Sequence, residues 1–197
     1  MGRYTATITS GSLKIPESRR IADLLLRGIA GKDWTRLIVD DNILQAKSPV
    51  TARSWAKMIR ARLETMKPEL WTLVRDGQGT VATHAVFAAS VKHSPLLGDF
   101  LDLVVADQHR KFAKALSPSL FDNYLTGCRE RDLAMPEWNE TTRARLRSSV
   151  FQMLAQAGYI ENTAELTLQP VHVAEQVLRY LRQNHEDYVL RCMQVSL

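Results

Sequence analysis

The sequence has few cysteines and no long hydrophobic run. It contains two cysteines, Cys128 and Cys192, and neither belongs to a Cys-x-x-Cys motif or a Cys/His cluster. This excludes a disulfide framework and favours a reducing compartment. The most apolar stretch, residues 81–91, has roughly half the length that a membrane-spanning helix needs. The N-terminus has no continuous apolar region of the kind found in signal peptides. These absences predict a soluble, cytoplasmic protein without a membrane partner.

Catalytic and cofactor motifs are also missing. The five histidines have no ligand-like spacing with one another or with cysteine, so no metal site is expected. Gly31-Lys32-Asp33 lacks the upstream glycine and the hydroxyl residue of a phosphate loop, and no nucleophile elbow or dinucleotide motif occurs. His84 lies in the apolar run and is expected to be a hydrogen-bonded core residue. The sequence therefore predicts no enzyme, no cofactor and no small-molecule substrate.

The composition that remains is that of an ordinary globular protein, with 45% hydrophobic and 24% charged residues. Apolar side chains recur mostly with helical spacing. We therefore expect a mainly α fold with helix-turn-helix and winged-helix-like units and one or two small β-hairpins. Residues 1–93 are predicted to form a basic, helix-turn-helix-like subdomain and residues 94–197 a winged-helix-like one. The alternative is one compact unit.

Prolines, capping residues and glycines predict the element boundaries. Helices are expected from Pro16 to about Gly31, from a cap at Asp33 to about Asp40, from a cap at Thr51 or a neighbour to about Met66, and over residues 68–74 and 80–91. Others are expected from Pro95, from Ser117-Pro118, over residues 140–157 with Asn139 as cap, from Pro170, and over residues 185–193. Residues 4–9 with 13–15 fit a hairpin or an extended arm. Residues 159–161 with 166–168 fit a hairpin that would serve as a wing.

Positive charge is concentrated at the start of the chain. Residues 1–67 hold 13 basic and 6 acidic residues, a net charge of +7, whereas residues 68–135 and 136–197 each have a net charge of −1. A concentrated positive field attracts phosphate backbones and other anionic surfaces. The plain alternative is that a surplus of this size is common among soluble proteins.

One helix in this region offers the chemistry of a DNA-reading helix. Cationic and hydroxyl side chains can contact phosphates and base edges from the outer face of a helix-turn-helix. Residues 34–66 can be interpreted in this way, although a solvated helix face fits the same spacing. The predicted nucleic-acid contacts are Arg19, Arg20, Lys47, Thr51, Arg53, Ser54, Lys57 and Arg60. Arg143 and Arg147, on the helix before the expected wing, form a weaker second candidate.

Several segments resemble a known family when they are taken together and in order. The sequence resembles the BrxA family of BREX (bacteriophage exclusion) phage-defence systems, most strongly over residues 4–63. The segments that carry the resemblance are Tyr4-Thr5-Ala6, Gly11-Ser12-Leu13, Pro16-Glu17-Ser18-Arg19, Ile21-Ala22, Leu24-Leu25-Leu26, Asn42-Ile43-Leu44-Gln45, Ser48, Thr51-Ala52-Arg53, Ile59 and Arg62-Leu63.

The resemblance implies a cytoplasmic, non-enzymatic, mainly helical DNA-binding protein that is encoded with a methyltransferase, an ATPase and other defence components. It carries over no catalytic residues, and the contacts named above come from charge and helix phase alone. Double-stranded DNA is therefore the leading partner. The open alternatives are RNA, in an antitermination-like role, and an acidic protein partner within the defence complex.

Overall fold

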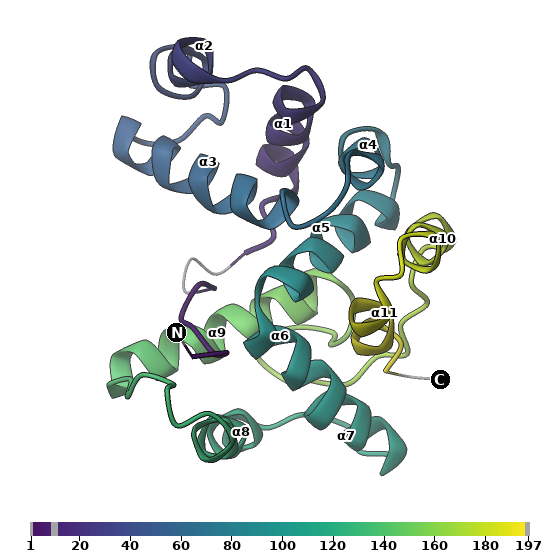
Figure 1. Cartoon of the computed structure of the whole chain (residues 1–197). Helices are drawn as coiled ribbons and strands as arrows, with labels where there is room; N and C mark the ends of the chain where they lie inside the picture. Colours follow the sequence, from purple (N-terminus) through teal and green to yellow (C-terminus); the bar gives the residue numbers. More distant parts are fainter. Residues whose placement is uncertain (1, 9–11, 196–197) are drawn as a thin grey trace. The chain divides into compact units, whose positions relative to one another are not determined.

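The computed structural model describes residues 2–8 and 12–195 (Figure 1). The chain forms two compact units, each made of segments that are separate in sequence. One, here called the α5 unit, comprises residues 13–93 and 174–180. The other, the α6 unit, comprises residues 1–12, 94–173 and 181–197. Each predicted subdomain is one continuous stretch of sequence. In the structure, the α6 unit also includes residues 1–12, and the α5 unit also includes residues 174–180.

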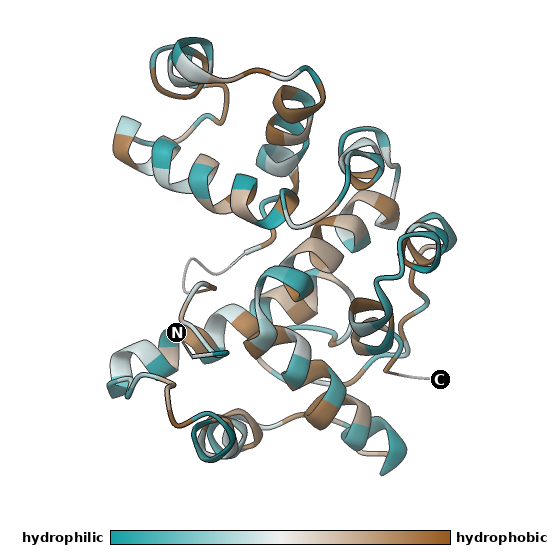
Figure 2. Cartoon of the chain, in the orientation of Figure 1, coloured by the Kyte–Doolittle hydropathy of each residue, from teal (hydrophilic) through white to brown (hydrophobic). Residues whose placement is uncertain are grey.

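The α5 unit is built around one apolar helix. It contains α1 (Ile15–Leu26), α2 (Gly31–Thr35), the π-helical segment η1 (Arg36–Asp40), α3 (Pro49–Leu63), α4 (Pro68–Asp76) and α5 (Thr80–His93). The helices α1, α3 and α4 all contact α5. Residues 84–91 of α5 are buried without interruption. In Figure 2, α5 has few hydrophilic residues, whereas hydrophilic and hydrophobic residues alternate along α3. The periodicity of the sequence predicts this difference between a central and a peripheral helix.

The α6 unit has an aromatic core. It contains α6 (Pro95–Phe100), the π-helical segment η2 (Leu101–Val105), α7 (Ala106–Arg110), α8 (Pro118–Arg131), α9 (Glu140–Gln156) and α11 (Asp187–Met193). The rings of Phe100, Phe121, Tyr124 and Phe151 lie with centroids 5.2–6.3 Å apart. Such tilted and edge-on pairs add to the free energy that burial supplies. These rings join α6, α8 and α9.

The mainly helical fold is confirmed, and the expected β-structure is much reduced. Residues 159–161 and 166–168 meet in a single bridge, Ile160 with Leu168, and a second bridge joins Ala115 to Thr167. Residues 4–8 contain no strand, so of the two predicted alternatives the extended arm fits them better than the hairpin. Thr9, Ser10 and Gly11, which belong to the same prediction, lie outside the described residues. The segment after α9 that is expected to form a wing is therefore a loop with isolated bridges.

Two predicted helix starts need correction. The residue that precedes α2 is Ala30, and Asp33 lies inside the first turn, where its carboxylate faces the positive helix end. The last long helix, α10 (Glu175–Gln183), begins five residues after Pro170. Residues 171–173 stay non-helical, and the backbone N–H of Ala174 donates to Nδ1 of His84 at 3.0 Å. His84 is thus a hydrogen-bonded core histidine, as its surroundings in the sequence predict.

Candidate nucleic-acid interface

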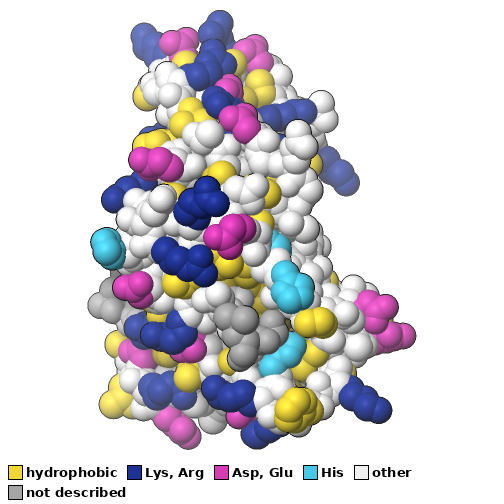
Figure 3. All heavy atoms as spheres, turned by 90° about the vertical axis from the view of Figure 1, so that its right-hand side faces the viewer, with side chains coloured by type: hydrophobic (Ala, Val, Ile, Leu, Met, Phe, Trp, Pro, Cys, Tyr) yellow, Lys and Arg dark blue, Asp and Glu magenta, His cyan; other side chains and the backbone are white. Residues whose placement is uncertain are grey.

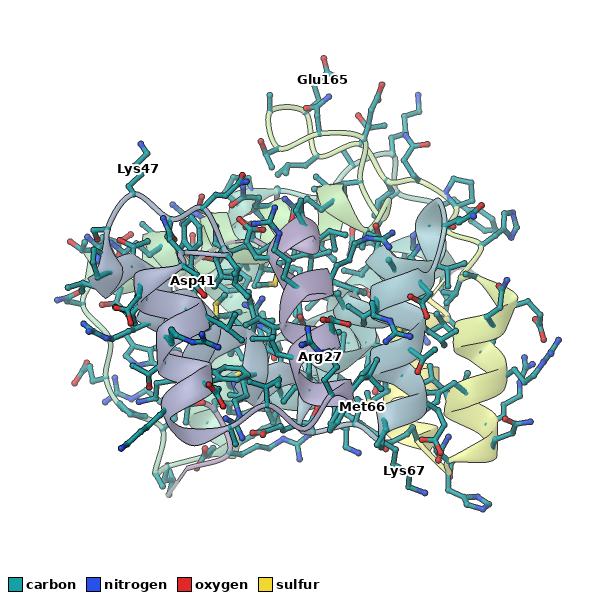
Figure 4. All side chains as sticks on the ribbon, turned by 90° about the horizontal axis from the view of Figure 1, so that it is seen from above. Arg27, Asp41, Lys47, Met66, Lys67 and Glu165 are labelled. Carbon is teal, nitrogen blue, oxygen red and sulfur yellow. The ribbon has the colours of Figure 1, made fainter. Side chains whose placement is uncertain are left out.

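The loop before α3 is held by its own polar groups. The Asn42 side chain donates to the carbonyl of Ala46 at 2.9 Å and accepts from the Ala46 N–H at 3.0 Å. Ser48 then caps α3, because its Oγ accepts from the Thr51 N–H at 3.2 Å and lies 2.9 Å from the Thr51 hydroxyl. Lys47 lies between these two fixed points and projects into solvent (Figure 4). Thr51 therefore belongs to the cap.

The α3 helix presents an exposed stripe of mixed chemistry. Val50 is 73% exposed, and Arg53, Ser54 and Lys57 are exposed beside it. We call these four residues with Lys47 the α3 face. The opposite side of the helix is buried through Ala52, Ala56, Ile59, Arg62 and Leu63. Within the described part of the chain, Lys47, Arg53 and Lys57 make no hydrogen bond or ion pair. Their charges are therefore available to an external anion.

A groove runs beside the α3 face. A cavity of about 330 Å³ lies between η1 and α3 and is lined by Trp34, Thr35, Ile38, Val39, Arg53, Ala56, Lys57 and Arg60. The Arg60 guanidinium lies 4.7 Å from the centre of the Trp34 ring and also pairs with Glu64 at 2.7 Å. The groove therefore combines an apolar lining with two unpaired cations and one that is already neutralised.

The two arginines of α1 have different surroundings. Arg19 donates to the backbone carbonyls of Arg75 and Gly77, so it satisfies the C-terminal end of α4. Arg20 has no ion pair among the described residues, and it lines a second cavity of about 390 Å³ with Arg27, Arg75 and Asp23. Asp23 pairs with both of those arginines, at 3.2 and 3.7 Å. This cavity therefore carries less free charge than its arginines suggest.

Arg143 and Arg147 belong to the α6 unit. The Arg147 guanidinium pairs with both carboxylate oxygens of Asp122, at 2.8 and 2.9 Å, and thereby joins α9 to α8. Arg143 is half-buried and lines a small cavity of about 170 Å³ beside Trp138 and Glu137. Of this pair, only Arg143 lacks an ion pair within the described residues.

Two residues of the α5 unit were missed as candidates. Trp34 is half-buried and lines the groove, and Lys32 is exposed one turn before Thr35 without an ion pair in the described chain. The charge of Lys32 could have been noticed in the sequence. The accessible surface of Trp34 could not, since it depends on how η1 packs against α3.

The chain is similar over nearly its whole length to proteins of one known family. The BrxA family model matches residues 2–185. A BREX protein BrxA from Paramagnetospirillum magneticum (strain ATCC 700264 / AMB-1) is 50% identical over 195 residues, which are 99% of this chain and 98% of the relative. This chain belongs to the BrxA family.

A more distant BrxA relative and a solved structure are also similar to this chain. The relative, from Escherichia coli O9:H4 (strain HS), is 32% identical, over 86% of this chain and 80% of its own. A crystal structure of an uncharacterized protein from Magnetospirillum magneticum matches with a TM-score of 0.92 at 48% identity, over 98% of this chain and 100% of that protein's chain. The BrxA architecture described here is therefore shared with a solved structure.

No described helix has the length and apolarity to cross a membrane. No group of three or more His, Cys, Asp or Glu side chains among the described residues has the arrangement to hold a metal ion. On the surface shown in Figure 3, Lys and Arg side chains are interspersed with Asp and Glu.

Proposed function

We propose that this BrxA-family protein binds double-stranded DNA through the α3 face, without catalysing a reaction. It is a BREX phage-defence component, and it would act in the cytoplasm, where DNA lies. One observation carries the proposal: Lys47, Arg53 and Lys57 are exposed on one surface with no anionic partner among the described residues. Cations of this kind release counterions from DNA when they contact phosphates, and this release supplies most non-specific affinity.

The shape of the α3 face also suits a duplex. A helix with its side chains is about 10–12 Å across, which matches the width of the major groove. Arg53 can donate both to a phosphate and to a guanine edge, Ser54 can donate to phosphate, and the exposed Val50 can contact a thymine methyl group. Because so few side chains reach base edges, we expect modest sequence selectivity. Residues 41–48 separate η1 from α3, a longer connection than the three or four residues of a standard helix-turn-helix.

A salt titration tests the proposal directly. Duplex DNA should bind at low salt, and the logarithm of the binding constant should fall linearly with the logarithm of salt concentration. Each lost phosphate contact lowers the slope by about 0.9, so Arg53→Glu with Lys57→Glu should flatten it by about 2 and weaken binding by at least about tenfold at low salt.

The matched control reverses two other cations of the α5 unit. Lys67 and Arg179 are exposed and have no ion pair within the described chain, so Lys67→Glu with Arg179→Glu changes the net charge equally. Lys67 points away from Lys47 (Figure 4). The control should keep the wild-type slope. Equal losses of affinity in both double variants would show that binding depends on the overall charge of the protein and would contradict a specific role of the α3 face. Absence of duplex binding at low salt would refute the proposal.

Competition decides between DNA and RNA. Structured RNA of equal length is added to the protein–DNA complex. If the α3 face fits the B-form major groove, the RNA should displace the bound DNA poorly, because the A-form major groove is too deep and narrow for a helix. Stronger competition by RNA than by unlabelled duplex would favour the antitermination-like alternative.

A further inference from the structure

An exposed phenylalanine ends the α7 helix in an unfavourable backbone conformation. Phe112 has φ +54° and is 92% exposed. Its N–H donates to the carbonyl of His109, and the next N–H, of Ala113, donates to the carbonyl of Gln108, each at 3.0 Å. These two bonds define a Schellman motif, in which Phe112 occupies the left-handed position that glycine normally fills.

Other helices of the same chain use the motif with a different residue. Gly28 after α1 and Gly158 after α9 occupy the equivalent position, with φ +66° and +82° and the same pair of backbone hydrogen bonds. His185 ends α10 in the same way, with φ +55°. Phe112 alone among these four combines the left-handed backbone with a large apolar side chain in solvent. Neither property stabilises the folded chain.

The backbone around Phe112 is fixed on both sides. The Schellman bonds tie its N-terminal side to α7 (Figure 1). On the other side, the Leu168 N–H donates to the carbonyl of Lys114 at 2.9 Å, and the Leu116 N–H donates to that of Leu166 at 3.0 Å. A side chain held out on an ordered loop loses little entropy when it binds. The phenyl ring is therefore presented ready for contact.

The surroundings of the ring are cationic. The exposed side chains of Arg110, Lys111 and Lys114 flank it, against one acid, Asp107, which pairs with Lys111 at 2.6 Å and lies 3.9 Å from Arg110. Residues 107–114 therefore carry a net charge of +2 with His109 neutral, and burial lowers the pKa of His109. A partner must accept an apolar ring between positive charges.

From this arrangement we infer that Phe112 is a second DNA contact, which inserts its ring against or between bases while Lys114 and Arg110 meet the flanking phosphates. Apolar side chains inserted between base steps beside basic residues are a recurring mode of DNA binding. A membrane surface fits less well, because interfacial segments carry a wide apolar helix face, and Phe112 is one ring. The inference rests on the proposed DNA binding.

Phe112→Gly separates the binding role from a role in folding. Because glycine is the preferred residue at this position, the urea midpoint of the variant should equal or exceed that of wild type. Loss of a stacked ring should weaken duplex affinity by about five- to one-hundredfold. The salt slope should stay unchanged, since no phosphate contact is lost. Lys114→Ala should instead lower the slope by about 1.

Two further variants serve as controls. Leu133 is also 92% exposed, so Leu133→Ala removes an equally exposed apolar side chain and should leave affinity unchanged. Phe112→Trp keeps an aromatic face and should retain at least half of the wild-type affinity. Wild-type affinity in Phe112→Gly would overturn the inference while the proposed DNA binding stands. A loss of binding to anionic phosphatidylserine vesicles, with unchanged DNA affinity, would overturn it in favour of a membrane contact. Failure of wild type to bind DNA would refute both.

Discussion

At the scale of single residues, Asp99 connects the three sequence segments that make up the α6 unit. Its carboxylate accepts from Arg3 at 2.9 and 3.0 Å, from the Tyr4 hydroxyl at 2.7 Å and from the Tyr188 hydroxyl at 2.7 Å. One side chain of α6 thereby holds both the N-terminal arm and α11. The Asp99 side chain is 11% exposed, so its charge depends on these donors for compensation.

We expect Asp99→Asn to destabilise the protein by about 1–3 kcal/mol, since it leaves the buried Tyr4 hydroxyl, the Tyr188 hydroxyl and the half-exposed Arg3 guanidinium without their charged acceptor. The comparison is Asp102→Asn, which removes a pair with Arg191 at 3.1 Å; the Arg191 side chain is 62% exposed. That exposed pair should contribute less than about 1 kcal/mol. Urea unfolding of both variants measures the difference, and similar midpoints would contradict the role assigned to Asp99.

The same carboxylate predicts a pH dependence. Burial opposes ionisation of Asp99, but hydrogen bonds from Arg3, Tyr188 and Tyr4 outweigh it, and the pKa of Asp99 falls below its ordinary value of 3.8. A lowered folded-state pKa contributes stability that is complete above 3.8 and is lost as the pH falls through the folded pKa. The gap in unfolding free energy between wild type and Asp99→Asn should therefore narrow below pH 4, and a constant gap would contradict this account.

Single residues also show why the contacts could be predicted only in part. Charge and helix phase place Arg53, Ser54 and Lys57 on one exposed stripe, and that stripe exists. The same reasoning selects Arg19 and Arg147, whose guanidinium groups already bind Gly77 and Asp122. These partners are distant in sequence, so neither composition nor periodicity reveals them.

At the scale of elements, serine followed by proline marks three helix starts. Ser48-Pro49, Ser94-Pro95 and Ser117-Pro118 each precede a helix with proline in its first turn, where the missing N–H has no intrahelical partner to lose. The three serines differ in what their side chains do. Ser48 and Ser94 accept a backbone N–H, and Ser117 does not.

This difference makes a matched pair of substitutions. Ser48→Ala should lower the unfolding free energy by about 1 kcal/mol, because the Thr51 N–H loses its acceptor. Ser117→Ala removes the same atoms from the same kind of position without losing a cap, so it should change stability by less than about 0.5 kcal/mol. Equal effects in thermal or urea unfolding would show that the Ser48 hydrogen bond contributes little.

Local signals also set the limit of what could be predicted for the elements. Proline predicts the starts of α3, α4 and α8, and Asn139 and Gly158 predict the two ends of α9, all correctly within a few residues. The π-helical segments η1 and η2 have no sequence signature of their own. The late start of α10 depends on His84, which lies 90 residues away. Contacts between residues distant in sequence therefore explain why the structure differs from the helix boundaries that periodicity predicts.

At the scale of the whole molecule, tryptophan fluorescence reports mainly on the α5 unit and thiol labelling reports on the α6 unit. Trp34, Trp55 and Trp71 belong to the α5 unit, and Trp138 to the α6 unit. Both cysteines lie in the α6 unit and are buried, and burial raises the pKa of the Cys192 thiol to about 12 and that of Cys128 above its ordinary value. Native thiols should therefore react slowly, since the thiolate is the reactive form.

These reporters test whether the chain unfolds as one cooperative system. The chain passes between the units at residues 12–13, 93–94, 173–174 and 180–181, the last of these inside α10. A helix that is continuous across such a point cannot lose one half without fraying the other. We therefore expect tryptophan fluorescence and thiol labelling to give coincident urea midpoints, as two-state unfolding requires. Asp99→Asn, although confined to the α6 unit, should then shift both midpoints equally. A fluorescence transition that stays in place while thiol labelling moves would show that the two units unfold independently.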